Sequence, residues 1–168
     1  LNAVNHNLSI ERSKIKMISL KKILCPIDHS DCSKEALKYA VSFAMRDEAK
    51  LYLLHIIDIR SFNESLNAMP TQIPDNETLE QLRIKLLDCI PEEMRDDMDV
   101  EAIVIQGIPF VEIISTSREK EIDMIVMGSH GRTGISHMML GSVSEKVVRK
   151  APCPVLIVRQ PDQKFVMP

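Results

Sequence analysis

The sequence predicts an α/β protein, with an open parallel sheet of five strands and helices on both faces. Short, nearly continuous apolar runs alternate with stretches in which apolar residues recur every three or four positions. Such apolar runs are typical of strands that helices cover on both faces, and the amphipathic stretches are typical of the helices that connect parallel neighbours. With 168 residues, 45% of them hydrophobic, the chain suits one globular domain.

The first third of the chain is predicted to hold two strands and one helix. The run Lys22–Ile27 is apolar and leads into a polar turn, as expected of a buried strand that feeds a loop. From Ser33 to Met45 apolar residues recur at helical spacing, and a polar residue within 30–33 is available as the N-cap. The apolar run Leu51–Ile57 is predicted to be the second strand.

The remaining elements continue the alternation. They are a helix over Leu79–Ile90 that Pro91 ends, a strand over Val100–Ile105, a helix over Pro109–Lys120, a strand over Met124–Met127, a helix over Ser142–Lys150 and a strand over Pro154–Val158. The segment Ile59–Asp75 is long for a connection, which suggests a lid or contact loop. Residues 1–20 are interpreted as an extension, 21–160 as the single domain and 161–168 as a tail.

The expected ligand position predicts the order of the strands. Open parallel sheets bind ligands outside the carboxyl ends of their strands, where the strand order reverses. The loops that begin at Asp28 and Gly128 follow the first and fourth strands. If both loops serve one site, those strands are neighbours and the order is 3-2-1-4-5.

Composition argues against several classes of function. The net charge is −3, and the chain has two Tyr, four Phe and no Trp, so we expect no nucleic acid as partner. The apolar runs are too short to cross a membrane, and the first residues do not resemble a secretory signal. The four cysteines are widely spaced, which does not suggest a metal cluster. We therefore expect a cytoplasmic protein without a bound structural metal.

A glycine-rich segment is the strongest functional signal. Four of the five glycines lie between Gly128 and Gly141. A glycine-rich turn after a strand can direct several main-chain N–H groups at one oxyanion, and Ser142 then opens a helix whose N-terminus favours negative charge. Phosphate is the obvious candidate ligand.

Structural roles remain open for the same residues. Ser142 and Glu145 match a capping box, and the glycines suit ordinary turns. Asp28 is interpreted as a turn residue or, because it would repel phosphate, as an acceptor for a sugar hydroxyl or a base amino group. His55, in an apolar strand, is predicted to be a hydrogen-bonded core histidine. Met138 and Met139 are predicted to pack rather than to bind a cofactor.

These segments together resemble the universal stress protein (UspA) family from about Lys21 to Val158. The resemblance rests on four stretches: Lys22–Ser30, Leu53–Asp58, Gly107–Pro109 and Met127–Arg132. The most specific feature is the pattern G-x2-G-x9-G-[ST], formed by Gly128, Gly131, Gly141 and Ser142, which is similar to that of the family's ATP-binding branch. His29 departs from the glycine or phenylalanine that usually follows the aspartate.

The resemblance implies a Rossmann-like fold of the adenine nucleotide alpha hydrolase type and an ATP site. The residues implied to meet the adenosine end or ribose are Pro26, Ile27, Asp28, Ile56, Met127 and Gly128. Those implied to meet the phosphates are Gly131, Gly141, Ser142 and Val143, with Ser129, His130 and Arg132 as neighbours. A divalent cation, Mg²⁺ or Mn²⁺, would be bound through the phosphates. The resemblance also implies a homodimer through the last strand, Pro154–Val158.

The sequence favours a regulatory protein over an enzyme. It contains neither the G-x-x-x-x-G-K-[ST] loop of P-loop enzymes nor an identifiable Ser/His/Asp arrangement. We therefore expect an ATP-dependent sensor or switch in stress response, with at most weak ATP hydrolysis. The alternatives are a protein-interaction module whose glycine loop is structural, and a slow ATPase.

Overall fold

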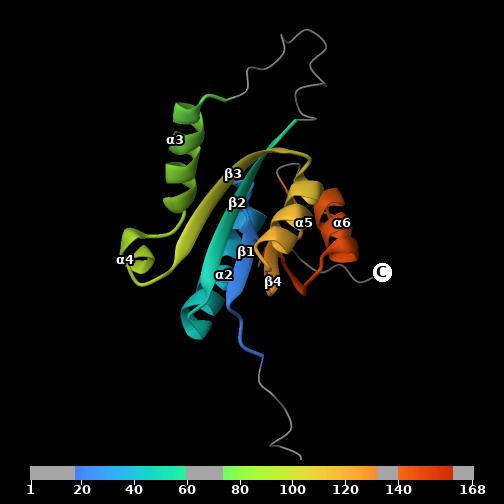
Figure 1. The fold of residues 1–168 in the computed structure, drawn as a ribbon. Helices are drawn as coiled ribbons and strands as arrows, with labels where there is room; N and C mark the ends of the chain where they lie inside the picture. The colour runs from blue at the N-terminus through green and yellow to red at the C-terminus, as the bar shows by residue number, and fades with distance from the viewer. Residues whose placement is uncertain (1–17, 60–73, 132–139, 161–168) are drawn as a thin grey trace, which may run out of the picture.

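A five-stranded parallel sheet forms the centre of the molecule, in the order β3-β2-β1-β4-β5 (Figure 1). The computed structural model describes residues 18–59, 74–131 and 140–160. Its elements are β1 (Lys22–Pro26), α2 (Asp31–Asp47), β2 (Lys50–Asp58), α3 (Asn76–Leu87), α4 (Glu92–Arg95), β3 (Val100–Gly107), α5 (Pro109–Glu119), β4 (Met124–Gly128), α6 (Ser142–Lys150) and β5 (Val155–Val158). The predicted fold class and strand order are confirmed.

Helices cover both faces of the sheet. Alternate strand residues pack on α2 and α3, as Ile23, Leu51 and Leu53 do, and these belong to one buried cluster with Ala36, Ala40 and Leu86. The residues between them face α5 and α6, and form a second cluster. This second cluster contains Leu24, Tyr52, Leu54, Ile113, Ile122, Ile125, Met127 and Val147. The nearly continuous apolar strands thus result from burial on two faces.

The local signals at the helix starts are mostly as expected. Ser30 is the N-cap of α2, and its side chain accepts a hydrogen bond from the Ser33 N–H at 3.2 Å.

The segment around Pro91 was predicted less well. α3 ends at Leu87, before the expected Ile90, and Pro91 precedes the short helix α4, which the sequence did not suggest. Proline lacks an N–H, so it ends one helix but fits well at the start of another.

The carboxyl edge of the sheet is uneven, and this creates room for a site. β1 pairs with β2 only as far as Pro26 opposite Leu54, after which the Ile27 N–H donates to the Leu54 carbonyl at 2.8 Å. β2 continues to Asp58, paired on its other side with β3. Since β1 leads to α2 on one face and β4 leads to α6 on the other, a crevice opens between their ends.

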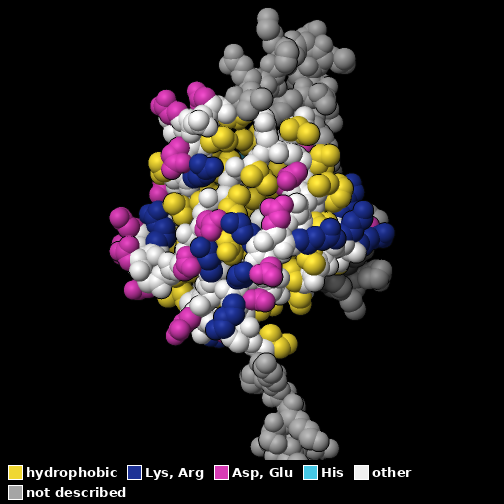
Figure 2. Space-filling view, viewed as in Figure 1, with side chains coloured by type: hydrophobic (Ala, Val, Ile, Leu, Met, Phe, Trp, Pro, Cys, Tyr) yellow, Lys and Arg dark blue, Asp and Glu magenta, His cyan; other side chains and the backbone are white. Residues whose placement is uncertain are grey.

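Charges are spread over the surface rather than gathered. Lys and Arg side chains lie among Asp and Glu side chains over most of the face shown in Figure 2, in keeping with a net charge of −3. In the part of the chain that the structure describes, no helix is both long enough and apolar enough to span a membrane. Most of the predicted Ile59–Asp75 loop lies outside the described residues.

Candidate functional site

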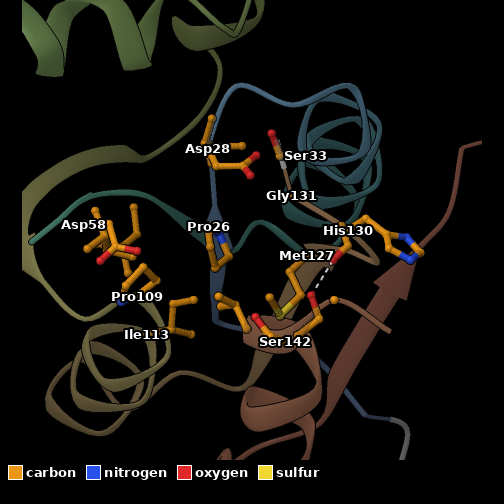
Figure 3. A pocket seen from close by; sticks show the side chains of 17 residues that line it. Pro26, Asp28, Ser33, Asp58, Pro109, Ile113, Met127, His130, Gly131 and Ser142 are labelled. Atoms are coloured by element: carbon orange, nitrogen blue, oxygen red, sulfur yellow. Dashed lines mark hydrogen bonds between the residues drawn. The ribbon is translucent and has the colours of Figure 1, made fainter. Parts of the chain in front are cut away.

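A pocket of about 290 Å³ opens at the carboxyl ends of β1, β2 and β4. Figure 3 shows Asp58 and Pro109 at one end and Ser142 and His130 at the other, with Pro26 between them. The lining residues are Pro26, Ile27, Asp28, Ser33, Leu54, Ile56, Asp58, Pro109, Ile113, Met127, Gly128, His130, Gly131, Gly141, Ser142, Val143 and Ser144. The two loops singled out in the sequence therefore do serve one crevice.

The N-terminus of α6 forms one wall. Gly141 is the N-cap, and the first hydrogen bond of the helix runs from the Glu145 N–H to the Gly141 carbonyl at 2.9 Å. The amides of Ser142, Val143 and Ser144 consequently have no acceptor within the helix. Ser142 is the first residue of the helix rather than its cap, and α6 has no side-chain cap, so the capping-box interpretation of Ser142 and Glu145 is wrong.

Ser129 fixes the loop around this wall. It is fully buried, its N–H donates to the Val158 carbonyl at 2.8 Å, and its own carbonyl accepts from the Gly141 N–H at 2.8 Å. Its hydroxyl lies 3.0 Å from His130 Nδ1, and the imidazole points away from Pro26 and Asp58 in Figure 3. The Gly141 N–H therefore has its acceptor within the protein. Ser129 holds the loop in place through these hydrogen bonds and does not itself line the pocket.

Gly128 and Gly131 have close neighbours within the protein. A Cβ on Gly128 would lie 2.8 Å from Cys32 Cβ and 2.9 Å from the Cys32 carbonyl carbon, so α2 packs directly on the end of β4. A Cβ on Gly131 would lie 2.7 Å from Asp28 Oδ2. The missing side chains therefore let other parts of the chain approach, as well as leaving the crevice open.

Asp28 makes the turn interaction suggested by the sequence, and it also lines the pocket. Its Oδ1 accepts hydrogen bonds from the Ser30 N–H at 3.0 Å and the Ser30 hydroxyl at 2.6 Å, which is a turn interaction. Its other oxygen, Oδ2, lies close to Gly131, and both residues line the pocket. The adjacent His29 has a φ of 64°, a conformation that histidine adopts more readily than most residues.

His55 makes a hydrogen bond of the kind that the sequence analysis expected. Its Nδ1 lies 2.7 Å from the Ile27 carbonyl, and a carbonyl only accepts, so Nδ1 carries the proton. Its ring centroid is 5.0 Å from that of His29. His55 does not line the pocket. The expected hydrogen bond is confirmed, but the side chain is half-buried rather than buried in the core.

The end of the pocket that lies away from α6 is mostly apolar. Leu54 and Ile56 contribute from β2, and Pro109 and Ile113 from α5. Main-chain groups of a strand face the same side at every second residue, and the Leu54 carbonyl bonds to β1. The N–H and carbonyl of Ile56 therefore point to the same side, where β1 has already ended.

The predicted site residues come together, with two exceptions. Ser129 lies buried behind the pocket, and Arg132 lies outside the described residues. The sequence analysis did not single out six lining residues: Ser33, Leu54, Asp58, Pro109, Ile113 and Ser144. Asp58 and Pro109 were available as signals, since Asp58 ends β2 and Pro109 comes shortly after β3, at the edge where ligands bind.

Comparison with known proteins gives a consistent result. The universal stress protein family profile matches residues 19–159. Universal stress protein MJ0531 of Methanocaldococcus jannaschii is 34% identical over 148 residues, which cover 86% of this chain and 85% of the relative. The solved structure of MJ0577 from the same organism is 33% identical, with a TM-score of 0.69, and the match covers 86% of this chain and 99% of that one.

More distant structures share the fold and hold ligands. A universal stress protein in complex with cAMP is 22% identical with a TM-score of 0.61, and the match covers 84% of this chain and 98% of that one. One from Archaeoglobus fulgidus in complex with dAMP is 20% identical with a TM-score of 0.57, covering 84% and 99%. At these identities the likeness establishes the fold alone. The profile match over nearly the whole domain and the relative at 34% identity establish more: the chain belongs to the universal stress protein family.

Proposed function

We propose that this protein binds an adenine nucleotide, ATP in the first instance, in the crevice and acts as a nucleotide-dependent sensor or switch in stress response. One observation carries the proposal: a single pocket joins the open N-terminus of α6 to an apolar end beside β2 and α5. A nucleotide has the matching polarity, with anionic phosphates at one end and a flat, mostly apolar base at the other.

The phosphates belong at α6. The amides of Ser142, Val143 and Ser144 and the helix dipole favour an anion there, although the dipole alone contributes only about 0.3 to 1 kcal/mol. Micromolar binding requires about 8 kcal/mol, so the base and ribose contacts must supply most of the affinity. Asp28 also lines the pocket, and its carboxylate suits a ribose hydroxyl rather than a phosphate.

The base belongs between β2 and α5. Ile56 and Pro109 offer apolar surfaces to a ring, and the main-chain groups of Ile56 point past the end of β1 toward it. The family members solved with cAMP and dAMP support an adenine base. A cation, Mg²⁺ or Mn²⁺, would be held through the phosphates, and the described residues contain no group of three His, Cys, Asp or Glu side chains suited to a metal.

Calorimetric titration of the purified protein with ATP, ADP and AMP tests the proposal. We expect saturable binding with a Kd of about 1 to 100 μM for at least one of them. Repeating the ATP titration with EDTA in place of Mg²⁺ measures the part played by the cation. Absence of binding by all three nucleotides at millimolar concentration would contradict the proposal and favour a protein-interaction module.

A homodimer through β5 is proposed as well. β5 lies at the edge of the sheet, and Val155, Leu156 and Ile157 are only partly buried. Among the described residues no strand pairs with its outer edge. An apolar edge of this kind favours pairing with a second copy. Light scattering at micromolar concentration should give twice the chain mass, whereas the mass of one chain would be evidence against the dimer.

A further inference from the structure

Among the residues that the structure describes, one carboxylate lines the apolar end of the pocket. Asp58 is the last residue of β2, is half-buried and lines the pocket. Figure 3 shows it beside Pro109 and far from Ser142. Side chains at every second strand position share one face, so Asp58 continues the row Tyr52, Leu54 and Ile56 toward α5. The earlier members of this row are apolar or aromatic, and Asp58 departs from the pattern where the row reaches the pocket.

The other described residues that line this end of the pocket have apolar side chains. Leu54, Ile56, Pro109 and Ile113 are apolar, and Pro109 also removes the N–H from the first position of α5. An ionised carboxylate only accepts hydrogen bonds. The described side chains at this end therefore offer an acceptor and no donor to a bound ring.

We propose that Asp58 accepts a hydrogen bond from the exocyclic amino group of the base, and so selects bases that carry an amino group at this edge. The inference rests on the proposed function, because it places the base beside β2 and the phosphates at α6. Adenine offers an amino group at C6. A purine with hydrogen at C6 offers no donor there, and the hydrogen bond would be lost.

The test compares AMP with purine riboside 5′-monophosphate, which lacks only the amino group. We expect the native protein to bind AMP about 10- to 100-fold more tightly, which is the effect of one hydrogen bond to a charged group. In Asp58→Ala the two Kd values should become nearly equal. In Asp58→Asn the carboxamide oxygen still accepts a hydrogen bond, so the preference for AMP should be largely retained.

The ratio of the two Kd values separates this role from a general change in charge. Removing a negative charge strengthens the binding of both monophosphates and leaves their ratio unchanged. Asp97→Ala, which removes an exposed carboxylate outside the pocket, is the matched control and should keep the native ratio. Thermal unfolding of each variant without nucleotide verifies that it is folded.

Each outcome distinguishes the inference from the proposed function. If the native protein binds neither monophosphate nor ATP, the proposed function fails. If it binds AMP and the analogue equally, or if Asp58→Ala keeps the native preference, nucleotide binding stands and the role of Asp58 is wrong. Loss of the preference in Asp58→Ala, with retention in Asp58→Asn and Asp97→Ala, supports the role.

Discussion

Replacing Gly128 with alanine should destabilise the protein by about 2 kcal/mol, within the range found for overpacked cores. The added Cβ would lie 2.8 Å from Cys32 Cβ and 2.9 Å from the Cys32 carbonyl carbon. These atoms belong to the first turn of α2 and include main chain, so a side-chain rotation cannot relieve the contact. Either α2 or the end of β4 must move, although both are packed in the core.

Gly107→Ala is the matched control. Gly107 also ends a strand at the same edge of the sheet, and an added Cβ there would also make a close contact, but with the side chain of Glu112. That side chain is flexible and can turn away. Both substitutions remove the same backbone freedom from the unfolded chain, so the difference between them isolates the clash.

Chemical denaturation of the two variants measures this difference. We expect Gly107→Ala to lie within about 0.5 kcal/mol of the native protein or to be slightly more stable. Equal free energies of unfolding for the two variants would show that α2 does not depend on close approach to Gly128. A displaced α2 should also weaken nucleotide binding, because Ser33 in its first turn lines the pocket.

The architecture was predictable because its signals are local. Helical spacing in α2, α5 and α6 and the apolar runs in the strands arise from burial, and they appear directly in the sequence. The strand order followed from the assumption that the loops beginning at Asp28 and Gly128 serve one crevice, and the observed order agrees with it. α4 was missed because Pro91 was interpreted only as the end of a helix, while its place just before a helix depends on the path of the following chain.

The site was predictable in its location and less so in its details. The glycines were interpreted as openings for a ligand, but the close contacts of Gly128 and Gly131 are with Cys32 and Asp28. Those contacts join segments about a hundred residues apart, so no local pattern reveals them. Leu54 and Ser144 were missed for a similar reason, since which residues face the crevice depends on where β1 ends and where α6 begins.

Ser142→Pro is expected to weaken nucleotide binding about 10- to 100-fold relative to Ser142→Ala. Proline removes the main-chain N–H from the first position of α6, where it is otherwise well tolerated. The preceding Gly141 has φ −60° and ψ 148°, the extended conformation that a residue before proline prefers. The helix should therefore form normally with one phosphate donor fewer, and a hydrogen bond to a charged group contributes about 1.5 to 3 kcal/mol.

Ser142→Ala is the control because both variants lack the hydroxyl and differ at the amide. Since the Ser142 side chain caps nothing in α6, alanine should leave stability unchanged and alter the Kd only a few-fold. Gly131 is less suitable for this purpose, because any side chain there also displaces Asp28. Calorimetric Kd values for ATP and AMP provide the comparison, with unfolding temperatures measured without nucleotide. Equal affinities for the proline and alanine variants would mean that the phosphates do not bind the first amide of α6, and the orientation proposed for the nucleotide would then have to be reversed or abandoned.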